Sequence, residues 1–266
     1  MVVGYLPLVV SLALVPVMTL GSIAFPVLYL ALHGDYDALL GDVQVRWFVG
    51  LVVAGTLALT GVLALVRSTG TLGADAVAAV FQFVSALSCT GFSTVSIGGL
   101  PSTAKLVLIL AMVVGGSAGS TVGGIKLVRL ITLSYGSIHR IRGSFYPAHA
   151  VRPLRIGDRL LTPARAAVEI QEAAIVSFLW VVFLLGGIAV LQTVFLLQGT
   201  PHPLLDVVFD VASAQGNVGL SSGLTAASLP WIGKLTLVGN MWIGRLEIVP
   251  TIVFLRGIVA GLNATA

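Results

Sequence analysis

The chain has 266 residues, of which 57% are hydrophobic and 9% are charged, and its mean hydropathy is +1.06. Soluble proteins carry about 25% charged residues, so this composition excludes an ordinary soluble domain and predicts an integral membrane protein. The net charge of +4 does not indicate nucleic-acid binding, because eight of the fourteen Lys and Arg residues lie between Lys126 and Arg165.

Five apolar segments are long enough for membrane-spanning helices, which need about 20 residues. They cover residues 2–32, 47–66, 102–133, 166–197 and 229–260. Two further apolar segments, 76–88 and 204–214, are too short to cross a bilayer and fit re-entrant pore helices. The sequence therefore predicts an all-α membrane protein with two units of the form span, pore helix, span.

These segments divide the chain into five parts. Residues 1–32 are expected to be the inner helix of a preceding unit, 33–46 a cytoplasmic linker, 47–133 one complete unit, 134–165 a basic loop and 166–260 a second complete unit. The positive-inside rule places the basic loop in the cytoplasm. The loops that follow the two pore helices are therefore expected to lie outside the cell.

Two segments that lie 128 residues apart repeat one pattern. Residues 81–94 and 209–222 share Phe, Ser-Ala, Gly and Ser at matching positions, and an internal repeat indicates a repeated structural unit. A short helix followed by Gly-containing polar backbone, between spans, is how ion filters of carbonyl oxygens are built. We therefore predict a cation filter formed by the carbonyl groups of Cys89, Thr90, Gly91, Phe92, Asn217, Val218, Gly219 and Leu220. The alternative is that both segments are ordinary turns between helices.

Three side chains in the short helices are expected to support this filter. Asp210 would lie at membrane depth, where a carboxylate is costly and is usually paired or functional. We favour a structural role, in which Asp210 holds the filter loop through hydrogen bonds, over direct ion binding. Gln82 occupies the matching place in the first copy, and Ser85 and Ser213 match one another.

A run of glycine and hydroxyl residues interrupts the third apolar segment. It contains Gly115, Gly116, Ser117, Gly119, Ser120, Thr121, Gly123 and Gly124. Each Gly costs about 1 kcal/mol relative to Ala in a helix, so a stable helix interior is excluded. One interpretation is a flexible loop below the filter that blocks or opens the permeation path. Spacing alone favours close helix packing of the small-xxx-small kind instead. A phosphate-binding loop is a third alternative, but the run lacks Gly-Lys-Ser/Thr.

Arg245 would lie near the middle of the last span, where a charge is expensive unless it faces water or a partner. We predict that Arg245 lines the pore below the filter, forms an electrostatic barrier and contacts the Gly-rich run. The alternative is a structural ion pair with Glu247 or another carboxylate. Lys105 and Lys234 are expected to be anchors at the outer membrane surface, with their amines reaching toward water.

The sequence contains no paired carboxylate site, no nucleophile with a base and no cofactor fingerprint. We therefore expect no enzyme activity, no cofactor in this chain, and no metal other than the transported cation. Cys89 is the single cysteine, so an intrachain disulfide is excluded.

Several segments, in order along the chain, resemble the Trk/Ktr/HKT superfamily of potassium transporters. Residues 21–26 resemble the end of its second repeat, 85–94 its third pore loop, 115–126 its interrupted third inner helix, 213–221 its fourth pore loop and 244–250 its fourth inner helix. The resemblance implies that 47–133 and 166–260 are the third and fourth repeats. It also implies that the Gly-rich run is a gating loop and that the chain is a pore-forming subunit for K⁺ uptake across the cell membrane.

The resemblance further implies a homodimer embedded in lipid and a ring of cytosolic regulatory subunits. Nucleotide is expected to bind to those subunits and not to this chain. Family members carry four repeats in one chain, whereas two complete units and one trailing helix are present here. We expect an N-terminally shortened sequence or one half of a split gene. The alternatives are a Na⁺-permeable member of the same superfamily, a secondary transporter with broken helices, and a non-conducting remnant.

Overall fold

The structure is a computed structural model that describes residues 8–66, 71–145, 153–157 and 159–246. These residues form helices joined by loops, with one small β-hairpin. The helices are α1 (Leu8–Gly21), α2 (Phe25–Leu32), α3 (Tyr36–Gly41), α4 (Val43–Val66), α5 (Leu72–Leu87), α6 (Ser102–Val114), α7 (Leu127–Gly143), α8 (Pro163–Leu197), α9 (Leu204–Gln215) and α10 (Trp231–Leu246). The prediction of an all-α membrane protein is confirmed.

Two of these helices, α4 and α8, are by themselves long and apolar enough to cross a bilayer. The first predicted span, residues 2–32, is instead broken between α1 and α2, which meet at a bend of 117°. The break coincides with Ser22, and Pro26 lies in the first turn of α2, where its missing N–H costs nothing. This break agrees with the length of the segment, which exceeds what one straight span needs.

The third predicted span is divided in the same way. Helix α6 ends at Val114, the Gly-rich run forms a loop, and α7 begins at Leu127. Helix α7 continues to Gly143, ten residues beyond the predicted end at 133, and carries Arg140 and Arg142 in its last turn. Cations near a helix C-terminus are favoured by the helix dipole, so this basic segment is helical where a loop was predicted.

The basic segment also contains a hairpin that the sequence did not predict. Strand β1 (Leu154–Ile156) pairs antiparallel with β2 (Arg159–Leu161), and Ile156 lies opposite Arg159. Leu154, Ile156 and Leu161 are buried in the main hydrophobic core, so the hairpin is anchored against the helices.

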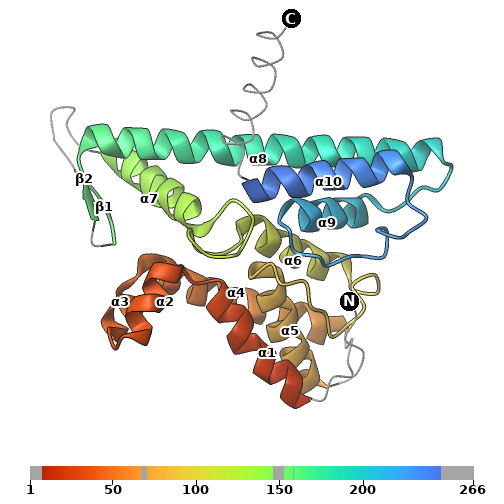
Figure 1. Ribbon diagram of the computed structural model, residues 1–266, viewed down its shortest axis with the longest axis horizontal. Coiled ribbons are helices and arrows are strands. Elements are labelled where there is room, and N and C mark those ends of the chain that lie inside the picture. The colour runs from red at the N-terminus through yellow and green to blue at the C-terminus, as the bar shows by residue number, and fades with distance from the viewer. Residues whose placement is uncertain (1–7, 67–70, 146–152, 158, 247–266) are drawn as a thin grey trace, which may run out of the picture.

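Helices α4–α5–α6 and α8–α9–α10 form the two units, and each has a short buried helix in its middle. In Figure 1, α8 runs along the top with α10 and α9 beneath it, α6 lies below them, and α1, α4 and α5 lie at the bottom. Helix α6 packs along α9, and α1 packs along α5. Thus α6 of the first unit covers α9 of the second unit, and α1, which precedes the first unit, covers α5.

Candidate ion filter and intramembrane loop

The two predicted filter loops have the same backbone conformation. Cys89 and Asn217, which are equivalent positions, adopt φ values of 51° and 54°, although neither is glycine. Gly91 and Gly219, also equivalent, adopt φ values of 74° and 93°. Positive φ is uncommon for residues other than glycine and persists only where surrounding contacts impose it. The sequence repeat therefore corresponds to a repeated and unusual backbone shape.

Equivalent hydrogen bonds hold both loops to their short helices. The N–H of Thr90 donates to the carbonyl of Ser85 over 3.1 Å, and the N–H of Val218 donates to the carbonyl of Ser213 over 2.8 Å. The serine side chains also contribute, in different ways. Ser85 Oγ donates to the carbonyl oxygen of Phe92 at 2.6 Å, whereas Ser213 Oγ accepts from the N–H of Gly219 at 3.1 Å.

The two loops lie directly against one another. A Cβ atom at Gly91 would fall 2.1 Å from the carbonyl oxygen of Val218, so only glycine permits this approach. Both loops also line one cavity of about 320 Å³, with Gly91 and Ser93 on one side and Gly219 and Ser221 on the other. The structure thus brings the two predicted filter segments together around a shared space.

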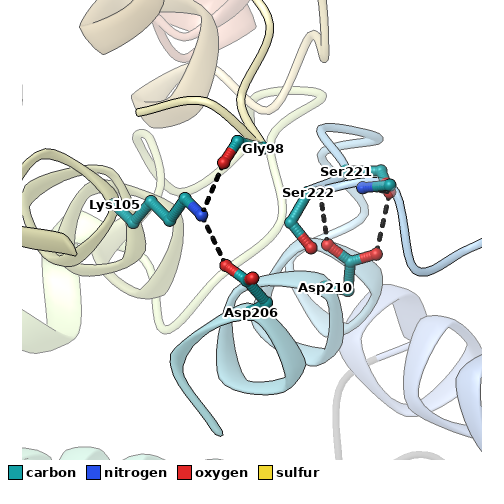
Figure 2. Close-up of polar contacts among 7 residues, drawn as sticks. Gly98, Lys105, Asp206, Asp210, Ser221 and Ser222 are labelled. Carbon is teal, nitrogen blue, oxygen red and sulfur yellow. Dashed lines mark hydrogen bonds and ion pairs between the residues drawn. The ribbon is translucent and has the colours of Figure 1, made fainter. Parts of the chain in front are cut away.

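Asp210 binds the loop segment that follows the second filter loop (Figure 2). Its carboxylate accepts from Ser221 Oγ at 2.8 Å, from the Ser222 N–H at 2.6 Å and from the Thr225 N–H at 3.2 Å. The side chain is buried. This geometry is that of the expected structural role, with the charge satisfied by three donors.

Gln82 makes the equivalent contacts in the first unit. With its amide oxygen facing the loop, it accepts from Ser93 Oγ at 2.8 Å and from the N–H groups of Thr94 and Val95 at 3.1 Å each. In the first unit all three donors point at one oxygen of Gln82. In the second unit the three donors are divided between the two oxygens of Asp210. A neutral amide therefore suffices in the first unit.

Lys105 does not reach toward water as predicted. It is buried, and its Nζ lies 2.6 Å from Asp206 Oδ1 and 3.1 Å from the Gly98 carbonyl oxygen (Figure 2). Asp206 lies in the first turn of α9, so this ion pair joins the two units. The prediction was wrong because the partner lies 101 residues away in the sequence. Lys234, in contrast, is exposed and donates to the Ala227 carbonyl at 2.7 Å.

The Gly-rich segment folds as a loop that returns to the end of α6. The N–H groups of Ile125 and Lys126 donate to the carbonyls of Val113 and Val114 over 2.9 and 3.1 Å. Gly123 lies near both filter segments: a Cβ there would fall 2.2 Å from the carbonyl oxygen of Gly216, and the Gly123 backbone lies next to the Cys89 side chain. The loop therefore lies against the base of the filter.

The other side of this loop is bound to the break between α1 and α2. The Ser117 N–H donates to the Ser22 carbonyl, and the Phe25 N–H donates to the Gly119 carbonyl, each over 3.0 Å. Thr121 Oγ1 donates to the Gly21 carbonyl at 3.0 Å. Three hydrogen bonds thus link the two interruptions in otherwise apolar segments.

Two side chains from other helices complete the contacts of the loop. Gln44 Oε1, at the start of α4, accepts from the Ala118 N–H at 2.9 Å. Arg245 Nη1 donates to the Thr121 carbonyl at 2.5 Å, and the Arg245 side chain is otherwise exposed. The predicted contact between Arg245 and the Gly-rich segment is therefore present. Glu247, the alternative partner, lies outside the described residues.

A family model, TrkH (cation transport protein), matches residues 5–259. The chain belongs to the TrkH family. Members of the TrkH family that resemble it carry the names of transport proteins and not of enzymes, in agreement with the expectation from the sequence. Together with its apolar helices, membership identifies the chain as a membrane protein.

Individual relatives match different shares of this TrkH-family chain. An uncharacterized cation transporter of Methanocaldococcus jannaschii is 34% identical over 174 residues, which are 65% of this chain and 35% of the relative. The Trk system potassium uptake protein TrkG of Escherichia coli is 28% identical over 82% of this chain and 43% of its own length. The chain thus spans less than half the length of these relatives.

The fold is also that of a solved TrkH-family structure. The crystal structure of the potassium transporter TrkH from Vibrio parahaemolyticus superposes with a TM-score of 0.79 over 94% of this chain and 53% of that one, at 23% identity. This likeness shows the fold.

Sequence reasoning missed Gln44, Ser22 and the ion pair of Lys105 with Asp206. Gln44 and Asp206 both carried a signal, since each is a polar residue in the first turn of a mainly apolar helix. Ser22 acts through its backbone carbonyl and gave no side-chain signal.

Proposed function

We propose that the protein is a pore-forming part of a K⁺ uptake transporter, with an ion filter built from the backbone of residues 89–92 and 217–220. The observation that carries this proposal is the pairing of two loops with equivalent positive-φ residues around one shared cavity. Backbone in this conformation can direct successive carbonyl oxygens at a dehydrated cation and replace its hydration shell.

The short helices add a favourable field at the filter. Helices α5 and α9 end at Leu87 and Gln215, directly before the filter segments. The C-terminal end of a helix carries about half a negative charge, which favours a cation nearby. An inside-negative membrane potential contributes about 2.3 kcal/mol per charge per 100 mV, enough to drive K⁺ inward without chemical coupling.

We propose that the loop of residues 115–124 gates this pathway. It lies next to Cys89 of the first filter segment and against Gly216, which directly precedes the second, and on its other side it is held by the break at Gly21–Ala24. Arg245 supports the closed position through its hydrogen bond to Thr121 and repels cations at the inner end of the filter.

The proposal includes the partners and topology that the family resemblance implies. The filter loops face the outside, and the basic residues of α7 and the hairpin face the cytoplasm. A cytosolic nucleotide-binding regulatory subunit docks on that basic face, and the transporter works as a homodimer. K⁺ is the transported ion, and nucleotide binds only to the regulatory partner.

The test is ⁸⁶Rb⁺ uptake by cells that make the protein, with K⁺ and Na⁺ as competitors. We expect K⁺ to suppress uptake at lower concentration than Na⁺ does. Gly219→Asp should abolish uptake, because it places a charged side chain on a backbone with φ of 93°. Gly61→Ala is the matched control, since a Cβ there meets no atom within 4 Å. Equal suppression by both ions would favour a Na⁺-permeable transporter, and full activity of Gly219→Asp would exclude this filter.

A further inference from the structure

A groove of about 550 Å³ lies between α7 and α8. Its lining residues are Val128, Arg129 and Thr132 of α7, and Glu169, Glu172, Ala173, Ile175 and Val176 of α8. None of them belongs to the filter segments or to the loop of residues 115–124. The α7–α8 groove is therefore a feature that the proposed function does not use.

The groove exists because the two helices touch at one place and then separate. Gly136 of α7 is buried beneath Ile170 of α8, and a Cβ there would lie 2.7 Å from Ile170 Cδ1. From this contact α7 slopes away from α8 toward Leu127 (Figure 1). The lining residues lie before Gly136 on α7 and, except for Glu169, after Ile170 on α8, so they come from the part where the helices separate.

A buried polar group in the groove lacks a protein partner. Thr132 is 6% exposed, and its hydroxyl makes no hydrogen bond to another described residue. Leaving a buried hydroxyl unpaired costs free energy, and nearly all such groups in proteins are hydrogen-bonded. Glu172 is exposed and likewise makes no ion pair or hydrogen bond within the described part of the chain. Both groups are free to bind a ligand that enters the groove.

The other two polar side chains of the groove are already held in place. Glu169 Oε1 accepts from Arg159 Nη2 at 2.8 Å, and Arg129 Nη1 donates to the Ile125 carbonyl at 3.1 Å. A guanidinium has five N–H donors, so Arg129 can also bind an acceptor on a ligand. The groove therefore offers a fixed cation and a free carboxylate.

The groove lies where α8 changes from polar to apolar. Glu169 and Glu172 are followed by residues 173–197, which contain no charged side chain. A span needs about 20 apolar residues, so Glu172 lies at the membrane surface, and Ile175 and Val176 lie just inside it. In the topology proposed above this is the inner surface. A ligand that fits has a polar head and an apolar tail, as a membrane phospholipid does.

The charges of the groove select the head group of the lipid. A purely anionic head group would meet Arg129 but also the free carboxylate of Glu172, which repels it. A zwitterion with a phosphate and an ammonium group satisfies both residues at once. A primary ammonium has three N–H donors for a carboxylate, whereas the quaternary ammonium of choline has none. The residues therefore favour an ethanolamine head group over glycerol or choline.

We propose that the α7–α8 groove binds phosphatidylethanolamine from the inner leaflet of the membrane. The phosphate accepts hydrogen bonds from Arg129 and from the Thr132 hydroxyl, the ammonium donates to Glu172, and an acyl chain lies along the apolar end of the groove. Because Arg129 also binds the carbonyl of Ile125, directly after the Gly-rich loop, the bound lipid contacts the residue that anchors the end of that loop.

Binding can be measured by native mass spectrometry of the whole chain in detergent, with added phosphatidylethanolamine, phosphatidylcholine or phosphatidylglycerol of identical acyl chains. We expect the ethanolamine lipid to bind at least about tenfold more tightly than the other two. Glu172→Gln should remove most of this preference. Thr132→Val keeps the shape of the side chain and should weaken binding of all three lipids by about twofold to tenfold. Asp37→Asn is the matched control, since it removes an exposed carboxylate outside the groove.

Photo-crosslinking in cell membranes then locates the lipid. The crosslinking amino acid p-benzoylphenylalanine at Ile175, in the groove, should trap the ethanolamine lipid in excess of its share of the membrane. At Leu185, exposed on the same helix outside the groove, it should trap lipids in proportion to the membrane composition. Equal binding of the three lipids, a preference that Glu172→Gln leaves unchanged, or a protein adduct at Ile175 would each overturn the proposal. These measurements require no ion flux, so their outcome is distinct from that of the ⁸⁶Rb⁺ uptake test.

Discussion

Asp210 offers the sharpest test of how the second filter loop is held. The Asp210→Asn variant keeps the shape of the side chain but turns one carboxylate oxygen into an NH₂ group. Oδ1 accepts from the Ser222 N–H, and Oδ2 accepts from both Ser221 Oγ and the Thr225 N–H. An NH₂ group at either position would therefore face a backbone N–H, and two donors cannot bond to one another. At least one hydrogen bond is lost whichever way the amide turns.

The size of the effect follows from these contacts. A hydrogen bond to a charged group contributes about 1.5–3 kcal/mol, and an unpaired buried donor costs a similar amount. Asp210 is buried, but Thr225 is exposed and can turn to water, so we expect a loss of about 2 kcal/mol. For a chain of this size, that corresponds to about 4–8 °C in the apparent melting temperature.

Two measurements check this prediction. Thermal unfolding of the detergent-solubilised protein should show the lower melting temperature, and ⁸⁶Rb⁺ uptake should lose part of its preference for K⁺ over Na⁺. Asp37→Asn is the matched control, because Asp37 is an exposed acid in α3, away from the filter. If Asp210→Asn and Asp37→Asn behave alike in both assays, the carboxylate does not hold the loop and the reasoning is refuted.

Three further substitutions test the filter, the loop and the contact between units. Gly91→Ala should abolish ⁸⁶Rb⁺ uptake, because the new Cβ would fall 2.1 Å from the Val218 carbonyl oxygen and the backbone φ at this position is 74°. Gly50→Ala is the control and should be active, since its Cβ meets no atom within 4 Å. Arg245→Gln removes the hydrogen bond to the Gly-rich loop and should raise the uptake rate between about twofold and tenfold; a lower rate would argue against a closed-state contact. Lys105→Met leaves Asp206 unpaired and should cost about 3 kcal/mol of stability, measured by thermal unfolding. The double exchange of Lys105→Asp with Asp206→Lys should recover part of that loss, and no recovery would mean that packing, not charge, is responsible.

The repeat in the sequence predicted two loops of the same shape because the local signals and the fold agree there. The matching Ser-Ala and Gly positions of residues 81–94 and 209–222 correspond to matching hydrogen bonds and φ values. The short helices were also predictable, since their length alone excludes a span. Helix α5 begins four residues earlier than the apolar segment because Thr71 caps it.

The features that sequence reasoning missed depend on contacts between distant segments. The burial of Lys105 follows from Asp206, and no local pattern connects the two. The hairpin has strands of three residues, too short for an alternating pattern, and is stabilised by burial of Leu154 and Ile156 against helices. Hydropathy also marks residues 2–32 as one apolar segment without showing where it breaks, because it does not register that Pro26 begins a new helix.

The Gly-rich loop is hydrogen-bonded to the break at Gly21–Ala24, so the loop can move only if water replaces these bonds. Displacing the loop would leave the carbonyls of Gly21, Ser22 and Gly119 and the N–H groups of Phe25 and Ser117 without protein partners. At membrane depth such groups can be satisfied only by water in a cavity. Opening and hydration of the inner pathway would then be a single event, so osmolytes that are too large to enter the pore should favour the dry, closed arrangement.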